Sequence, residues 1–114
     1  MQLPDIQRKL VEEQVGKFCD ERFPSHVKSQ LQVGYNIRGN TVTIIEKRIS
    51  YKNPDEWIHI PIAQIRYNAK DSSWLLCCAD RNGRWHDYEE LKADKSLDRL
   101  LRELGDDPSG IFWG

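Results

Sequence analysis

The segment 80–88 contains residue types that can hold an anion or stack on a nucleic-acid base. Arg81 and Arg84 flank an Asn-Gly pair, and His86 and Tyr88 follow at alternate positions. An Asn-Gly pair between two strand-like runs predicts a hairpin with a two-residue turn. That register would place Arg81 opposite Arg84, with both arginines, His86 and Tyr88 on one face. Because stacking surfaces combine aromatic rings with positive charge, this set is our candidate binding site.

An alternative interpretation needs no ligand. The two arginines would be solvated residues beside the turn, and His86 and Tyr88 would pack at the edge of the core. Like charges placed opposite each other are mildly unfavourable unless Asp80, another neighbour or a ligand neutralises them. This repulsion is the local argument for a bound anion.

A second basic group lies in the middle of the chain. Residues 34–70 contain six basic and three acidic residues, whereas residues 71–90 contain two basic and five acidic residues. Lys47, Arg48 and Lys52, close to aromatic side chains, are candidate contacts for a phosphate backbone. The competing interpretation, which we favour, is a charged strand edge that deters aggregation.

The sequence lacks the spacings of metal sites and of common catalytic motifs. Adjacent Cys77 and Cys78 would point to opposite faces of a strand, so they cannot chelate one metal ion together. The histidines, His26, His59 and His86, do not form an HExxH motif or a comparable pattern. We therefore assign no metal, no cofactor and no catalytic residue, although an enzyme site assembled from distant segments stays open.

Composition indicates a globular chain with no strong global field. The 114 residues are 39% hydrophobic and 31% charged, with a formal net charge of −1. The first residues lack the apolar core of a signal peptide, and the longest apolar run, 74–79, is far shorter than a membrane span. Three cysteines do not make a disulfide framework. We expect a cytoplasmic protein that does not enter membranes.

Periodicity predicts the elements of a single domain over residues 1–114. Apolar residues spaced for a helix cover about 4–22 and 95–104, with Asp94 or Ser96 as the N-cap of the second helix and Gly105 as its stop. Extended runs predict strands over about 31–38, 41–49, 57–68, 73–80 and 84–89. A phase slip beside Pro61 indicates a bulge and an edge position for that half of the strand.

This order of elements predicts a two-layer α+β fold. An antiparallel sheet of about five strands would carry the N-terminal and the C-terminal helix packed on one face. The alternatives are a partly closed barrel and a sheet with helices on opposite faces.

The C-terminal segment 107–114 combines a turn with large apolar side chains. DPSG fits a type I turn, after which Ile111, Phe112 and Trp113 follow. Burial of such side chains can contribute about 2 kcal/mol each before ordering costs. We predict that this tail docks on its own domain, while docking on another chain is the alternative.

Four stretches of the chain form a specific combination. They are FCDERFPSHVKSQLQVGYNIRGNTVTIIEKR, EWIHIPIAQIRY, WLLCCADRNGRWHDY and the terminal DPSGIFWG. On these motifs the chain resembles a family of short bacterial proteins grouped as domain of unknown function 3024. The resemblance implies a bacterial, stand-alone domain, and it implies no activity, cofactor or catalytic residue.

Our main functional hypothesis is a small non-catalytic interaction module whose partner is another protein or a second copy of the chain. It rests on the missing catalytic and metal spacings, the near-neutral charge and the aromatic residues of the strands and tail. The second hypothesis is a nucleic-acid-binding domain that uses the positive middle and the RNGRWHDY hairpin. An enzyme is the third.

Overall fold

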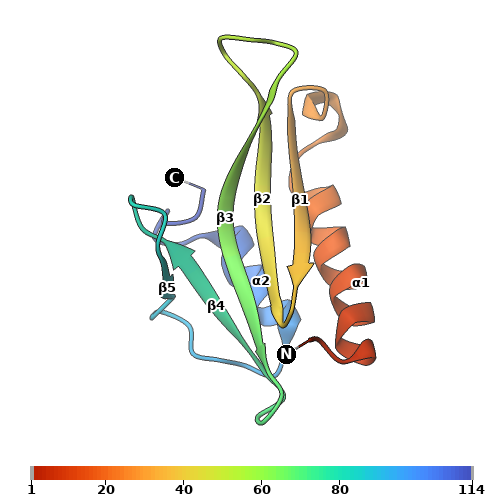
Figure 1. The fold of residues 1–114 in the computed structure, drawn as a ribbon, viewed down its shortest axis with the longest axis vertical. Helices are drawn as coiled ribbons and strands as arrows, with labels where there is room; N and C mark the ends of the chain where they lie inside the picture. The colour runs from red at the N-terminus through yellow and green to blue at the C-terminus, as the bar shows by residue number, and fades with distance from the viewer. Residues whose placement is uncertain (1, 114) are drawn as a thin grey trace.

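A five-stranded antiparallel sheet with both helices on one side forms the protein (Figure 1). The computed structural model describes residues 2–113. The elements are α1 (Asp5–Glu21), the 3-10 helix η1 (Ser25–Val27), β1 (Leu31–Arg38), β2 (Thr41–Ile49), β3 (Trp57–Asn68), β4 (Ser73–Ala79), β5 (Trp85–Asp87) and α2 (Leu97–Asp106). The strand order β1-β2-β3-β4-β5 is an open meander, so the predicted α+β class is confirmed and the barrel alternative is wrong.

The core lies between the helices and one face of the sheet. The apolar stripe of α1 buries Val11, Val15 and Cys19, and that of α2 buries four leucines. They meet the buried side chains of the strands, which include Val42, Ile44, Ala63, Ile65, Tyr67, Trp74, Leu76 and Cys78. In Figure 1, α2 lies behind the strands and α1 runs beside β1. Each fully buried leucine contributes about 2 kcal/mol before entropy costs.

The predicted irregularity beside Pro61 is a β-bulge. The pairing of β2 with β3 shifts between Ile44, which lies opposite Ala63, and Ile45, which lies opposite Pro61. Ile62 of β3, between these two pairs, therefore has no partner in β2. Because β4 pairs only with the second half of β3, from Ala63 onward, the half that contains Pro61 is an edge on that side. Proline fits there because the missing N–H is not needed for the ladder.

The register of the last hairpin differs from our prediction. A two-residue turn would pair Ala79 with His86. The structure instead pairs Ala79 with Trp85 and Cys78 with His86. A slip of one residue moves every side chain of a strand to the other face of the sheet. His86 therefore lies on the helix-covered side, and Trp85 lies on the opposite side.

The cause is a turn that is one residue longer than predicted. The backbone N–H of Asp80 donates to the carbonyl of Arg84 at 2.8 Å, which leaves 81–83 as the loop. Gly83 has a φ of 77°, so it takes the left-handed position that closes such a three-residue loop. β5 is also shorter than the predicted strand over 84–89.

α2 is shifted toward the C-terminus relative to the predicted helix over 95–104. Ser96 is its N-cap, since its hydroxyl accepts from the backbone N–H of Arg99 at 3.3 Å. The predicted stop, Gly105, lies inside the helix. A Cβ at Gly105 would lie 3.4 Å from the ring of Phe18, at van der Waals contact, so α2 approaches the Phe18 ring of α1 closely at this position.

Asp107 ends α2 and directs the tail back onto the domain. Its φ is 42°, and its carboxylate accepts from the backbone N–H groups of Phe112 and Trp113 at 3.1 and 2.8 Å. Phe112 is only 6% exposed, whereas Ile111 is 50% exposed and differs in this from the burial expected for all three apolar residues. The indole N–H of Trp113 donates to the carbonyl of Leu104 at 2.8 Å.

Candidate functional site

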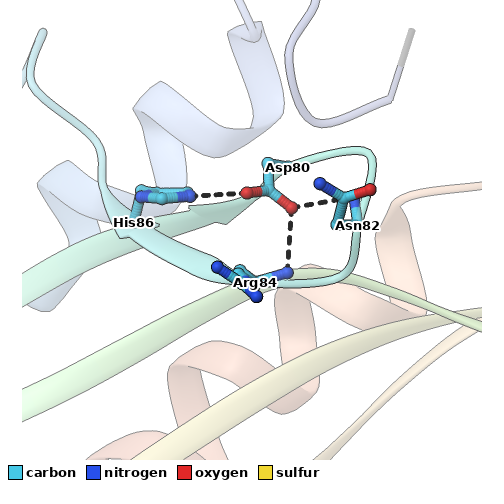
Figure 2. Close-up of polar contacts among 4 residues, drawn as sticks. All are labelled: Asp80, Asn82, Arg84 and His86. Atoms are coloured by element: carbon cyan, nitrogen blue, oxygen red, sulfur yellow. Dashed lines mark hydrogen bonds and ion pairs between the residues drawn. The ribbon is translucent and has the colours of Figure 1, made fainter.

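The turn between β4 and β5 is organised by one carboxylate. Asp80 Oδ1 accepts from the backbone N–H groups of Asn82 at 2.8 Å and Arg84 at 3.0 Å. Asp80 Oδ2 lies 2.7 Å from Nε2 of His86. Figure 2 shows the three contacts converging on Asp80. The hydrogen bond from His86, followed by the backbone donors, lowers the pKa of Asp80.

The four residues of the predicted cationic and aromatic set lie in three different surroundings. Arg81 and Arg84 are exposed at the turn, and His86 is held by Asp80. Tyr88 is buried, and its hydroxyl lies 2.7 Å from a carboxylate oxygen of Glu103. Burial, followed by the hydrogen bonds to Glu103 and Glu90, raises the pKa of Tyr88. The structure therefore does not present the Tyr88 ring beside the arginines.

Beside this turn is a surface cavity of about 420 Å³ with an acidic lining. Its charged groups are Asp80, Asp87, Glu89 and Glu90, and its wall also contains Cys78 and Ile111. Such a lining repels phosphate and does not favour an anion.

The three cysteines are free and buried. Burial raises the pKa of Cys19 to about 12. Burial also raises the pKa of Cys77 and of Cys78, and the carboxylates of Asp80 and Asp87 act in the same direction on Cys78. A nucleophilic cysteine needs a thiolate, which these surroundings disfavour.

The strand register gathers a different set of residues on the side of the sheet turned away from the helices. We call this side the open face, and Figure 1 shows it in front of α2. Its polar and aromatic side chains come from Gln32, Asn36, Arg38, Thr41, Thr43, Lys47, Trp57, His59, Gln64, Arg66, Asn68, Ser73, Trp85 and Asp87. Its apolar members are Ile45, Ile49, Leu75, Cys77 and Ala79.

The strand residues of the open face carry three permanent cations and one carboxylate. Arg38 and Arg66 flank Thr41 in one cross-strand row, and Lys47 lies opposite His59 in another. The Lys47 side chain extends over β1, because a Cβ at Gly34 would be only 3.3 Å from its Nζ.

Arg66 has a fixed orientation. Its Nε and Nη2 donate to Oε1 of Gln64 at 3.3 and 2.9 Å. The amide of Gln64 in turn donates to the hydroxyl of Thr43 at 3.4 Å. The guanidinium is thus held over the centre of the sheet before any partner arrives, which lowers the entropy cost of binding.

The three predicted phosphate contacts do not converge. Lys47 lies on the open face, and Lys52 lies in the exposed loop before β3. Arg48 is on the opposite side of β2, where its Nε donates to Glu46 at 3.0 Å.

Sequence reasoning missed Arg38, Arg66 and Trp85 as members of one surface. Alternation within β1 and β3 was the available signal for the two arginines. Alternation could not assign Trp85 to this surface, because the predicted turn length placed its side chain on the wrong face of the sheet.

A family model described as "Domain of unknown function (DUF3024)" matches residues 3–114. The chain belongs to this family. No curated protein and no solved structure matches it. Within residues 2–113 of this DUF3024 protein, no helix has the length and apolar character needed to cross a membrane.

Proposed function

We propose that this protein is a non-catalytic binding module for single-stranded nucleic acid and that the open face is its binding surface. One observation carries the proposal. The register places Arg38, Lys47 and Arg66 on the same uncovered face as Trp57 and Trp85. Binding of a single strand combines two components, cations along the path of the phosphate backbone and aromatic rings on which the bases stack.

A single strand suits this surface better than a duplex. The rings of Trp57 and Trp85 are partly exposed on different strands, and each can stack on a base that is free of a pairing partner. Stacking of this kind contributes about 1–3 kcal/mol per base. The bases of a duplex are already stacked, so the tryptophans would have only the backbone to contact.

The charge distribution changes the preference reached from the sequence, which was a protein partner or a second copy. The formal net charge of −1 is unevenly distributed. Three of the four permanently charged strand residues of the open face are cations, whereas the cavity beside β5 is lined by carboxylates, and Asp87 belongs to both surfaces. A bacterial origin and the cytoplasmic placement stay predictions, and cytoplasm would bring the chain into contact with single-stranded RNA. The enzyme hypothesis receives no support from Cys77 and Cys78, because burial raises the pKa of both thiols, although Arg66 acts in the opposite direction on Cys77.

Binding of labelled short oligonucleotides, measured by fluorescence anisotropy over a range of salt, tests the proposal. We expect binding at low salt that weakens steeply as salt rises, because phosphate contacts release counterions. Arg66→Gln should weaken binding and reduce the slope of log K against log salt by about 0.7, the value for one contact with a single strand. Trp85→Ala should weaken binding without changing the slope.

Arg8→Gln is the matched control, because it removes an exposed arginine from α1 on the helix side. It should leave binding unchanged. Failure of the wild-type protein to bind any oligonucleotide at low salt would overturn the proposal. So would equal losses for Arg8→Gln and Arg66→Gln. A dimer in light scattering that Trp85→Ala dissociates, without oligonucleotide binding, would assign the open face to a second copy.

A further inference from the structure

A single carboxylate lies among the cations of the open face. Asp87 is exposed on β5, directly across from Cys77 on β4. Its Oδ1 receives a long contact from the Cys77 thiol, at 3.9 Å. The ion pairs found among residues 2–113 use other carboxylates. A carboxylate repels phosphate, so its place on a surface for a phosphate backbone calls for a different role.

The neighbours of Asp87 indicate that role. Trp85 precedes it by two residues, so the indole and the carboxylate lie on the same face of the same strand. On the other side of β4, Gln64 lies opposite Cys77, and Arg66 lies opposite Leu75, one cross-strand pair further along β3. The guanidinium of Arg66 is turned back toward the row of Cys77 and Asp87, because its Nη2 donates to Oε1 of Gln64 at 2.9 Å. β3 and β5 are two strand spacings apart, roughly 10 Å. The fully buried side chain of Cys77 forms the floor between them.

The arrangement supplies acceptors at one end, donors at the other and an aromatic ring beside them. A carboxylate has two acceptor oxygens that match a pair of adjacent N–H donors. Guanine offers such a pair on its Watson–Crick edge, in N1–H and the exocyclic amino group. Adenine and cytosine offer only an amino group there. Uracil and thymine place carbonyl oxygens on both sides of one N–H, and these would repel the carboxylate.

The adjacent Hoogsteen edge of guanine fits the guanidinium. O6 and N7 are both acceptors, and arginine is the side chain that most often binds them. A guanine between Asp87 and Arg66 would therefore satisfy both groups at once, and its face would be available to Trp85 for stacking.

We propose that Asp87, Trp85 and Arg66 form a guanine-binding site on the open face. Guanine within a strand and guanine of a free nucleotide share this chemistry. The strand form of the proposal rests on the proposed function, whereas binding of the free nucleotide does not.

The test compares oligothymidine with the same strand carrying one central guanine, adenine or cytosine, at one low salt concentration. The guanine strand should bind at least about fivefold tighter than the others, as expected for a bidentate contact. Asp87→Asn should abolish this preference, because an amide presents one acceptor and one donor. It should leave the affinity for plain oligothymidine unchanged or higher, because it also removes a negative charge from the phosphate path.

That opposite response separates base recognition from a structural role. A variant that merely perturbed the sheet would bind all strands more weakly. Glu13→Gln on α1 is the matched control and should keep the guanine preference. Equal affinity for all strands in the wild-type protein would overturn the guanine site, as would a preference that survives Asp87→Asn.

A second experiment measures by calorimetry the binding of guanosine monophosphate and, for comparison, of adenosine monophosphate. Binding of the guanine nucleotide that Asp87→Asn abolishes, in a protein that binds no strand, would keep the guanine site and overturn the proposed function. If neither strand nor nucleotide binds, both proposals are wrong.

Discussion

Asp80 shows how much of the local structure a single side chain can determine. Its carboxylate accepts from two backbone N–H groups inside the turn and from the ring of His86 on the returning strand. The loop conformation and the orientation of the histidine therefore depend on the same charge.

The lowered pKa of Asp80 has a consequence for stability against pH. A carboxyl group whose pKa is lower in the folded state than in the unfolded chain stabilises the fold above its unfolded pKa of about 3.9. This contribution is lost as the pH falls through the folded pKa. Because the hydrogen bond from His86 is the largest cause, His86→Ala should raise the pKa of Asp80. An NMR titration of the Asp80 side-chain carbon measures this directly.

His26→Ala is the control, because His26 lies in η1 and is exposed. It should leave the titration of Asp80 unchanged. The interpretation would be wrong if Asp80 titrates at the same pH in the wild-type protein and in His86→Ala.

Among the elements, the β4–β5 hairpin depends on one backbone conformation. Gly83 has a positive φ, and a Cβ there would meet nothing within 4 Å. Gly83→Ala therefore tests backbone strain without a steric clash. We expect a loss of about 1 kcal/mol in the free energy of unfolding, seen as a fall in melting temperature of about 4 °C.

Gly34→Ala in β1 provides the comparison. Only the flexible end of Lys47 approaches that position, at 3.3 Å, so the side chain can move aside. Its melting temperature should stay closer to the wild-type value. Equal losses at the two glycines would contradict an origin in the left-handed conformation of Gly83.

The elements also show where sequence reasoning succeeds and where it stops. Alternation and helical spacing predicted the strands and helices, and the slip beside Pro61 predicted the bulge, because these signals are local. The turn after β4 was wrong by one residue. An Asn-Gly pair is compatible with both loop lengths, and the choice depends on the hydrogen bonds of Asp80.

In the whole molecule, the C-terminal tail connects segments that are distant in the sequence. The ring of Phe112 packs on Tyr88 with centroids 5.0 Å apart. Trp113 contacts Phe18 and Phe23 near the end of α1, with centroids 6.5 and 6.3 Å apart. The guanidinium of Arg22 lies 4.3 Å from the Trp113 ring, a cation–π geometry.

Two neighbouring tail residues should therefore differ sharply in their effect on stability. Phe112→Ala removes a ring that is 6% exposed and should cost about 3 kcal/mol, lowering the melting temperature by more than about 10 °C. Ile111→Ala, at a side chain that is 50% exposed, should cost much less. Thermal unfolding followed by circular dichroism measures both, and similar losses would contradict the described packing.

The candidate surface was harder to predict than the fold, because it is a property of the whole sheet. Each of its residues is visible in the sequence, but their common face depends on the bulge in β3 and on the length of the last turn. Each of these two features moves the side chains that follow it in the strand to the other face of the sheet. Errors of one residue leave the fold class intact and still redistribute the surface chemistry.

The four tryptophans are divided between the two sides of the sheet. Trp74 lies in the core and Trp113 packs against it, whereas Trp57 and Trp85 lie on the open face. The two pairs of indole rings therefore have different surroundings, one pair at the core and the other on the open face. Emission from the inner pair reports on unfolding, and quenching of the outer pair by iodide reports on what covers the sheet.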